Sequence, residues 1–313
     1  MLTRLASLCV LSALGLGGCA PDPDPDANPA AESGVDQSEL VRFEVDLVDD
    51  TRPLPAAGNG EAADERPIGV WGWVGAATAA QASERPLLLM AHGVGGHPEK
   101  FDAFATHLAE QGIVVLAPVF PSSSRERDDA LVAGVMDLEN QPGDLSFVLD
   151  WALAEHGAAG TPLEGRFDPD AVAALGHSLG GATVLGLTRY PSALDDRVDA
   201  VVLVAAAAFL GSTFGDAPQA DGSPTLLVHG TDDGSVPYAS SDDLRDEIEP
   251  SWLLDLPGTG HSEMLESQES PPIAARDATQ RAVLAHLREA LLGEAGARAE
   301  ALDALAAEGF PVR

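Results

Sequence analysis

Residues 171–182 of this 313-residue chain read AVAALGHSLGGA, and this stretch decides the fold. The apolar run Ala171–Leu175 is typical of a strand buried on both faces of a parallel sheet. It leads into Gly176-His177-Ser178-Leu179-Gly180, a Gly-x-Ser-x-Gly pattern that opens a helical segment. In that setting the pattern predicts a tight strand-to-helix turn that raises the serine hydroxyl above the sheet at a helix N-terminus. We therefore predict Ser178 as a nucleophile; the alternative is a glycine-rich turn with an idle serine.

Short apolar runs recur along the chain and alternate with helical patterns. The first two runs mix polar and apolar residues, which favours antiparallel edge strands, whereas the later ones are continuously apolar. This alternation predicts the α/β class: a doubly wound, mostly parallel sheet of about eight strands with helices on both faces. The expected strands are Val41–Val48, Ile68–Val74, Leu87–Ala91, Ile113–Ala117, Ala171–Leu175, Ala200–Val204, Thr225–Val228 and Trp252–Leu256. The expected helices are Pro98–Gln111, Asp144–His156, Leu179–Arg189, Ala275–Leu292 and Glu294–Ala307.

Reactive groups are expected in the loops that follow the strands, because the carboxyl ends of parallel strands meet at one edge of the sheet. A serine nucleophile needs a base that takes its proton. The strand Thr225–Val228 runs into a loop that holds Asp232 and Asp233, and we predict Asp233 as the acid. Asp232 is the rival, because adjacent side chains diverge and only one can reach the base. The strand Trp252–Leu256 ends in small residues before His261, which we predict as the base oriented by Asp233.

The other histidines are expected to serve the structure rather than the reaction. His107, His156 and His286 lie within predicted helices and are expected at the surface. His229 precedes the acid loop and is expected to pack. His177 flanks the serine and is expected to point away from the turn.

A glycine-containing loop, His92-Gly93-Val94-Gly95-Gly96-His97, follows the strand Leu87–Ala91. Glycines let such a loop turn a backbone N–H toward a substrate oxygen. We predict an oxyanion hole made of the N–H groups of Val94 and Leu179. A metal site on His92 and His97 is the alternative, but no carboxylate cluster lies near them in the sequence. We predict neither a metal nor a cofactor.

Together these residues resemble an α/β-hydrolase. The matching stretches are His92–Gly96, Gly176–Gly181, Gly230–Pro237 and Gly258–His261, within an alternating pattern that covers Val41–Leu292. Three further segments are similar to the branch of enzymes like dienelactone hydrolase and platelet-activating-factor acetylhydrolase: Leu87–Pro118, Gln141–Leu145 and Thr51–Pro55. The resemblance implies a serine enzyme that cleaves carboxylic esters. Dienelactone hydrolases themselves use a cysteine nucleophile where this chain has Ser178, so lactone specificity does not carry over.

The loops at the predicted site are short. About twenty residues separate the strands that end at Val204 and begin at Thr225, and no long helical insertion is seen there or after Ala117. We therefore expect no large lid domain and an open site. Candidate wall residues, for which ordinary loop packing is an equal alternative, are Phe120, Phe209, Phe214, Tyr238 and Met264.

The N-terminus has the form of an export signal. Arg4 precedes the apolar run Leu5–Leu16, which is too short to cross a membrane comfortably, and two glycines lead to Cys19. Residues 16–19 resemble a bacterial lipobox, in which the cysteine is acylated; ordinary secretion with cleavage near Ala20 is the alternative. The predicted units are a signal peptide (1–18), a Pro/Asp-rich tether (19–37) and one catalytic domain (38–313). They predict an exported protein that is lipid-anchored at the outer membrane, in the periplasm or at the cell surface of a bacterium.

Composition excludes several classes of protein and of site. The chain has 2 cysteines, Cys9 and Cys19, so the predicted catalytic domain holds no thiol nucleophile, disulfide or thiolate metal site. Lys and Arg number 17 against 50 Asp and Glu, a net charge of −33, which disfavours nucleic-acid binding. Two interpretations of this acidity are adaptation to high salt and the bias of a GC-rich genome.

The leading hypothesis is a serine hydrolase that cleaves carboxylic esters through an acyl-enzyme. Its expected partners are an ester substrate and, through the anchor, a membrane. The alternatives are a polyester- or lipid-directed hydrolase, a peptidase on the same fold, and a surface-displayed binding module without catalysis.

Overall fold

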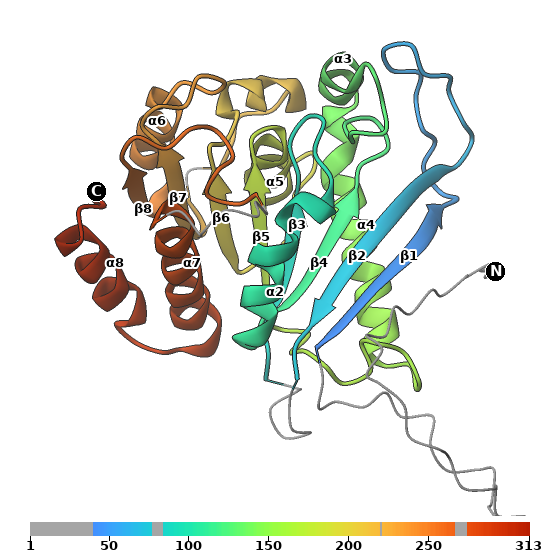
Figure 1. Cartoon of the computed structure of the whole chain (residues 1–313). Coiled ribbons are helices and arrows are strands. Elements are labelled where there is room, and N and C mark those ends of the chain that lie inside the picture. The colour runs from blue at the N-terminus through green and yellow to red at the C-terminus, as the bar shows by residue number, and fades with distance from the viewer. Residues whose placement is uncertain (1–39, 77–83, 220, 267–273) are drawn as a thin grey trace, which may run out of the picture.

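The computed structural model describes residues 40–76, 84–219, 221–266 and 274–313 (Figure 1). Their strands form one 8-stranded sheet in the order β1-β2-β4-β3-β5-β6-β7-β8. β2 is antiparallel to β1 and to β4, and the remaining neighbours are parallel. The strands are β1 Val41–Asp49, β2 Arg66–Val74, β3 Leu87–Ala91, β4 Val114–Val119, β5 Val172–His177, β6 Ala200–Val204, β7 Asp221–Gly230 and β8 Glu249–Leu256.

Helices cover both faces of the sheet (Figure 1). One side carries α2 (Asp102–Glu110) and α7 (Ala274–Leu292), and the other carries α4 (Gln141–His156) and α5 (Leu179–Arg189). Side chains of a strand alternate between the two layers: in β3, Leu87 and Leu89 join the core beneath α4 and α5, while Leu88 and Met90 join the core beneath α2 and α7. All four are fully buried or nearly so, and each contributes about 1.5–3 kcal/mol through burial. The predicted doubly wound α/β sheet is confirmed.

The predicted helices begin and end close to the expected positions, and the described residues form further helices that were not predicted. The α-helices are α2 Asp102–Glu110, α3 Ala130–Met136, α4 Gln141–His156, α5 Leu179–Arg189, α6 Ala239–Glu247, α7 Ala274–Leu292 and α8 Ala297–Ala307. The 3₁₀ helices are η1 Pro98–Phe101, η2 Leu138–Asn140 and η3 Ala208–Phe214. The last helix starts three residues later than predicted because Gly293 and Gly296 adopt positive φ, which interrupts a right-handed helix.

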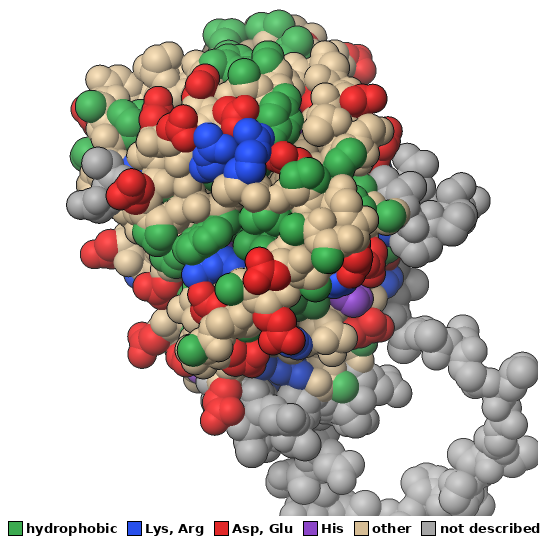
Figure 2. All heavy atoms as spheres, turned by 90° about the vertical axis from the view of Figure 1, so that its left-hand side faces the viewer, with side chains coloured by type: hydrophobic (Ala, Val, Ile, Leu, Met, Phe, Trp, Pro, Cys, Tyr) green, Lys and Arg blue, Asp and Glu red, His purple; other side chains and the backbone are tan. Residues whose placement is uncertain are grey.

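The described connections at the carboxyl edge of the parallel strands hold only short helices, such as α3 and η3, and no large lid. The predicted signal peptide, Cys19 and nearly all of the predicted tether lie outside the described residues. None of the helices in the described ranges is long and apolar enough to cross a bilayer. Carboxylates are scattered over the face that carries α6, β8 and α8, with Lys and Arg in a few separate groups (Figure 2).

The outer edge of β8 is paired with the residues that follow α8. Leu253 N–H donates to Arg313 O at 2.8 Å, Arg313 N–H donates to Leu253 O at 2.9 Å, and Asp255 N–H donates to Pro311 O at 2.8 Å. These bonds form an isolated antiparallel bridge between Leu254 and Val312. The described sheet therefore does not end in a bare β8 edge.

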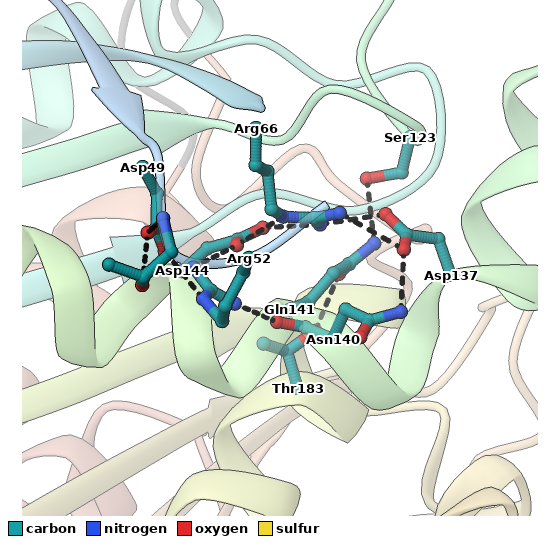
Figure 3. A network of polar contacts seen from close by, with 10 residues as sticks. Asp49, Arg52, Arg66, Ser123, Asp137, Asn140, Gln141, Asp144 and Thr183 are labelled. Atoms are coloured by element: carbon teal, nitrogen blue, oxygen red, sulfur yellow. Dashed lines mark hydrogen bonds and ion pairs between the residues drawn. The ribbon is translucent and has the colours of Figure 1, made fainter. Parts of the chain in front are cut away.

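A buried ion network fastens β2 to the helical layer (Figure 3). Arg66, the first residue of β2, has a fully buried side chain and donates to Asp137 Oδ2 at 2.7 Å and to Asp144 Oδ2 at 2.6 Å. Arg52, which is 29% exposed, reaches Asp144 Oδ1 at 2.9 Å from the rim. Arg66 thus holds the start of α4 against the sheet.

Candidate active site

Ser178 occupies a strained turn between β5 and α5. Its φ of 56° and ψ of −119° lie outside the regions that L-residues ordinarily adopt. Its N–H donates to Val204 O at the end of β6, at 3.0 Å, which fixes the turn against the neighbouring strand. A Cβ on Gly180 would lie 2.2 Å from Ala91 O, and one on Gly176 would lie 2.2 Å from Gly180 O. Glycine is therefore required at both positions. Ser178 itself is partly exposed, whereas its neighbours in the turn are buried.

The structure brings Ser178, His261 and Asp233 together. Ser178 Oγ–H donates to His261 Nε2 at 2.9 Å, and His261 Nδ1–H donates to Asp233 Oδ2 at 2.7 Å. The Asp233 side chain is fully buried and that of His261 is 22% exposed. The three groups follow β5, β7 and β8, so they meet at the carboxyl edge of the sheet.

Asp233, and not its neighbour Asp232, faces the imidazole. Its other oxygen accepts the backbone N–H of Ser235 at 2.7 Å and of Val236 at 2.9 Å. Burial raises the pKa of Asp233, but the hydrogen bonds from His261 and these two amides outweigh it, so the pKa lies below its usual value. Asp232 is exposed and accepts the hydroxyl of Thr231.

His229 contacts the acid, which the sequence did not indicate beyond its four-residue spacing from Asp233. It is fully buried at the end of β7, with Nε2 3.1 Å from Asp233 Oδ2 and Nδ1 2.7 Å from Ser241 Oγ. Burial lowers the pKa of His229, so the ring is neutral at pH 7. Val236 O lies 3.3 Å from Nε2 as well, and because both neighbours of Nε2 are acceptors, Nε2 carries the proton and Ser241 donates to Nδ1. His229 is thus a second imidazole, beside His261, that donates to Asp233 Oδ2.

Two expectations about histidines were wrong, those for His177 and His286. His177 does not point away: its ring lies 4.7 Å from that of His261, and its Nε2 is 3.0 Å from His261 O. His286 is fully buried rather than at the surface and donates to Pro224 O at 3.2 Å. His156 is half-buried, with its ring 4.6 Å from Phe167, and His107 is also half-buried.

We expect the free energy of unfolding to fall by about 4 kcal/mol when the pH is lowered from 7 to 5. Burial lowers the pKa of His92, His177 and His286 to about 4, so the unfolded chain binds protons that the folded chain does not, and stability is lost below pH 6.5. Asp255 opposes this, because burial and the charge of Asp242 raise its pKa to about 6. Urea unfolding at both pH values measures the change.

The control for this prediction is His286→Gln, which removes one buried imidazole far from Ser178 and is expected to flatten the pH dependence. Equal stability of the parent protein at pH 7 and pH 5 would contradict the prediction.

The predicted oxyanion loop lies beside the serine. A Cβ on Gly93 would lie 2.8 Å from Ser178 Cβ and 3.3 Å from its Oγ. Gly95 N–H donates to Ser123 O at 2.8 Å, which ties the loop to the segment after β4. The backbone N–H groups of Val94 and Leu179 donate to no acceptor among the described residues. Both are therefore available to a substrate oxygen.

The histidines that flank this loop are used in packing. His92 is buried, accepts the N–H of Phe120 at 3.1 Å and lies 2.7 Å from Gly93 O. His97 accepts the N–H of Glu99 at 3.2 Å. Within the described ranges no three His, Cys, Asp or Glu side chains are grouped to hold a metal.

Most of the candidate wall residues pack rather than line a site. Phe120 and Met264 are fully buried and Phe214 is nearly so, as in the alternative of ordinary loop packing. Tyr238 donates its hydroxyl to Asp255 and lies 5.4 Å, centroid to centroid, from the His229 ring. Phe209 is 62% exposed on η3.

Comparison with known proteins supports the fold. No family model and no curated protein matches the chain. Among solved structures, a ferulic acid esterase from Streptomyces cinnamoneus is similar with a TM-score of 0.59 at 20% identity, over 86% of this chain and 93% of that one. With the sheet order and the turn at Ser178, this similarity shows that the chain has the α/β-hydrolase fold.

Proposed function

We propose that this protein is a serine hydrolase that cleaves carboxylic esters. The observation that carries the proposal is the hydrogen-bonded chain from Ser178 through His261 to Asp233 at the carboxyl edge of the sheet. Such a chain makes a hydroxyl nucleophilic, because the imidazole accepts its proton while the carboxylate stabilises the resulting cation. The fold is similar to that of a ferulic acid esterase, by name an ester-cleaving enzyme, which supports a carboxylic ester as the bond that is cleaved.

In the proposed reaction Ser178 Oγ attacks the ester carbonyl and its proton passes to His261 Nε2. The carbonyl oxygen gains negative charge next to the free N–H groups of Val94 and Leu179, which stabilise it. The tetrahedral intermediate collapses, and His261 returns the proton to the departing alcohol. Water then attacks the acyl-enzyme with His261 again as the base, which releases the carboxylic acid and restores Ser178.

We further propose that the enzyme acts outside the cytoplasm on a lipid anchor. The support is the sequence alone: the apolar run before Cys19, and the proline- and aspartate-rich residues 20–37 that would hold the domain away from a membrane. Incorporation of labelled palmitate into the expressed full chain, abolished by Cys19→Ala, is the result that supports this part.

A fluorophosphonate probe with a panel of p-nitrophenyl esters tests the proposed activity. The expected result is covalent labelling of Ser178, mapped by peptide mass spectrometry, and turnover of esters in preference to p-nitroanilide amides of the same acyl groups. Folded protein that neither labels nor turns over would favour a binding module. Faster cleavage of the amides would favour a peptidase.

A further inference from the structure

Gln141, the first residue of α4, is a buried amide that joins two segments of the site (Figure 3). Its side chain is fully buried. Its Nε2 donates to Ser123 Oγ at 3.2 Å, and its Oε1 accepts the hydroxyl of Thr183 at 2.7 Å. One amide group therefore links the segment after β4 to the helix that follows Ser178.

Each partner of Gln141 forms a hydrogen bond close to one of the two free N–H groups, at the residue that carries it or at the next one. Ser123 accepts the N–H of Gly95 through its carbonyl, at 2.8 Å, and Gly95 is next to Val94. Thr183 lies one turn into α5, and its hydroxyl is also 3.2 Å from the carbonyl of Leu179. A continuous series of hydrogen bonds therefore runs from Gly95, next to Val94, through Gln141 to the carbonyl of Leu179.

The same two segments also pack against Gly134 of α3. A Cβ on Gly134 would lie 2.6 Å from Ser123 Cβ and 3.1 Å from Leu179 Cδ2. Both segments are therefore packed tightly on α3, and the hydrogen bonds of Gln141 hold them together there.

A neutral amide suits this place because it donates at one end and accepts at the other. The start of α4 is anchored through Asp144, on the next turn, which accepts two hydrogen bonds from Arg66. Among the described residues Gln141 bonds no charged group. Its effect on the site is therefore to hold neighbouring groups in place, without a change in charge.

We propose that Gln141 is a positioning residue that fixes the separation of the Val94 and Leu179 N–H groups, and so the fit of the oxyanion hole to the transition state. This inference rests on the proposed function. Donors of this kind act on the charge that develops during reaction, so a small displacement lowers the rate more than it weakens substrate binding.

The test compares Gln141→Met, which keeps the length of the side chain without its hydrogen bonds, with Asn140→Ala, which removes a bond in the same network but contacts neither Ser123 nor Thr183. For Gln141→Met we expect kcat to fall ~10–100-fold with KM within about threefold. This loss is smaller than the ~10²–10³-fold cost of removing an oxyanion donor outright, because the two N–H groups are displaced and not removed. The Ki of an alkyl boronic acid, which forms a tetrahedral anion on the serine, should rise by the same factor, while the Ki of the product acid stays constant.

Asn140→Ala is expected to lower the melting temperature and to leave kcat unchanged. Thr183→Val should reproduce part of the loss of kcat and Thr183→Ser, which keeps the hydroxyl, should restore it; this pair decides the matter if Gln141→Met does not fold. Unchanged kcat in the folded Gln141→Met or Thr183→Val protein overturns this inference but leaves the proposed function standing. A loss of kcat in Asn140→Ala equal to that in Gln141→Met does the same. A parent protein that cleaves no ester and takes no fluorophosphonate overturns the proposed function itself.

Discussion

Replacement of Ser178 by alanine is expected to lower kcat/KM for p-nitrophenyl esters by at least ~10³-fold, toward the ~10⁶-fold loss seen when the nucleophile of a serine triad is removed. The hydroxyl oxygen forms the bond to the acyl group, and the hydroxyl donates its hydrogen bond to His261 Nε2, 2.9 Å from Oγ. The melting temperature should change little, because Ser178 Oγ makes its contact at the surface of the turn and the backbone bonds to Val204 remain. Steady-state kinetics and thermal unfolding on the same preparation measure both effects.

Two neighbouring variants provide the matched control. Asp233→Asn should lose activity to a comparable degree, because an amide at this position no longer stabilises the imidazolium and favours the wrong tautomer of His261. Asp232→Asn alters an exposed carboxylate that His261 does not contact and should retain activity within about twofold. Full turnover by Ser178→Ala, or equal losses in the two aspartate variants, would contradict the assignment of the site.

Arg66→Met is expected to reduce the free energy of unfolding by about 3–5 kcal/mol. The Arg66 side chain and those of Asp137 and Asp144 are each fully buried, so removal of the cation leaves two carboxylates in the core without their main partner. The deficit should shrink at low pH, because burial raises the pKa of Asp144 and its carboxyl takes up a proton there once the cation is gone. Urea unfolding at pH 7 and pH 4.5 measures both quantities.

Arg52→Met is the control for this prediction, because Arg52 binds Asp144 in the same network from a position that is 29% exposed. Its loss should cost less, about 1–2 kcal/mol, because neither buried carboxylate that it binds is left without a donor. Asp144 keeps Arg66, and Asp49 keeps the N–H and hydroxyl of Thr51. The combination of Arg66→Met with Asp137→Asn and Asp144→Asn should recover part of the stability, because no buried charge is then uncompensated. A cost for Arg66→Met no larger than that for Arg52→Met would contradict the prediction.

The sequence predicted the central strands because they are buried on both faces and therefore read as unbroken apolar runs. It missed α6 because Ala239–Glu247 is largely polar and buries only Ser241 and Leu244, which leaves almost no periodic signal. It missed α3 because Ala130–Met136 spans only seven residues and contains valine and glycine, which are poor helix formers.

The candidate site could be predicted where its residues follow strand ends, since chain order and the edge of the sheet then decide the arrangement. The contacts of buried histidines depend on packing between distant segments, so the sequence around each histidine gives only a weak indication of them. His286 shares a face with Thr279, Ala282 and Val283, all buried on α7, and that spacing is the signal that would have placed it in the core. His177 lies on a strand whose two faces are both covered, so alternation does not tell which neighbour it meets.

The pairing of Pro311–Arg313 with β8 has a consequence for contact between molecules. A strand at the rim of a sheet recruits strands from other chains when its amide and carbonyl groups are unoccupied. Here Leu253 pairs both its N–H and its carbonyl with Arg313, and Asp255 pairs its N–H with Pro311. Arg313 adds an ion pair to Asp242 at 2.8 Å. A second molecule would have to displace this strip before it could extend the sheet, so the fold carries its own barrier against fibril-like growth on that side.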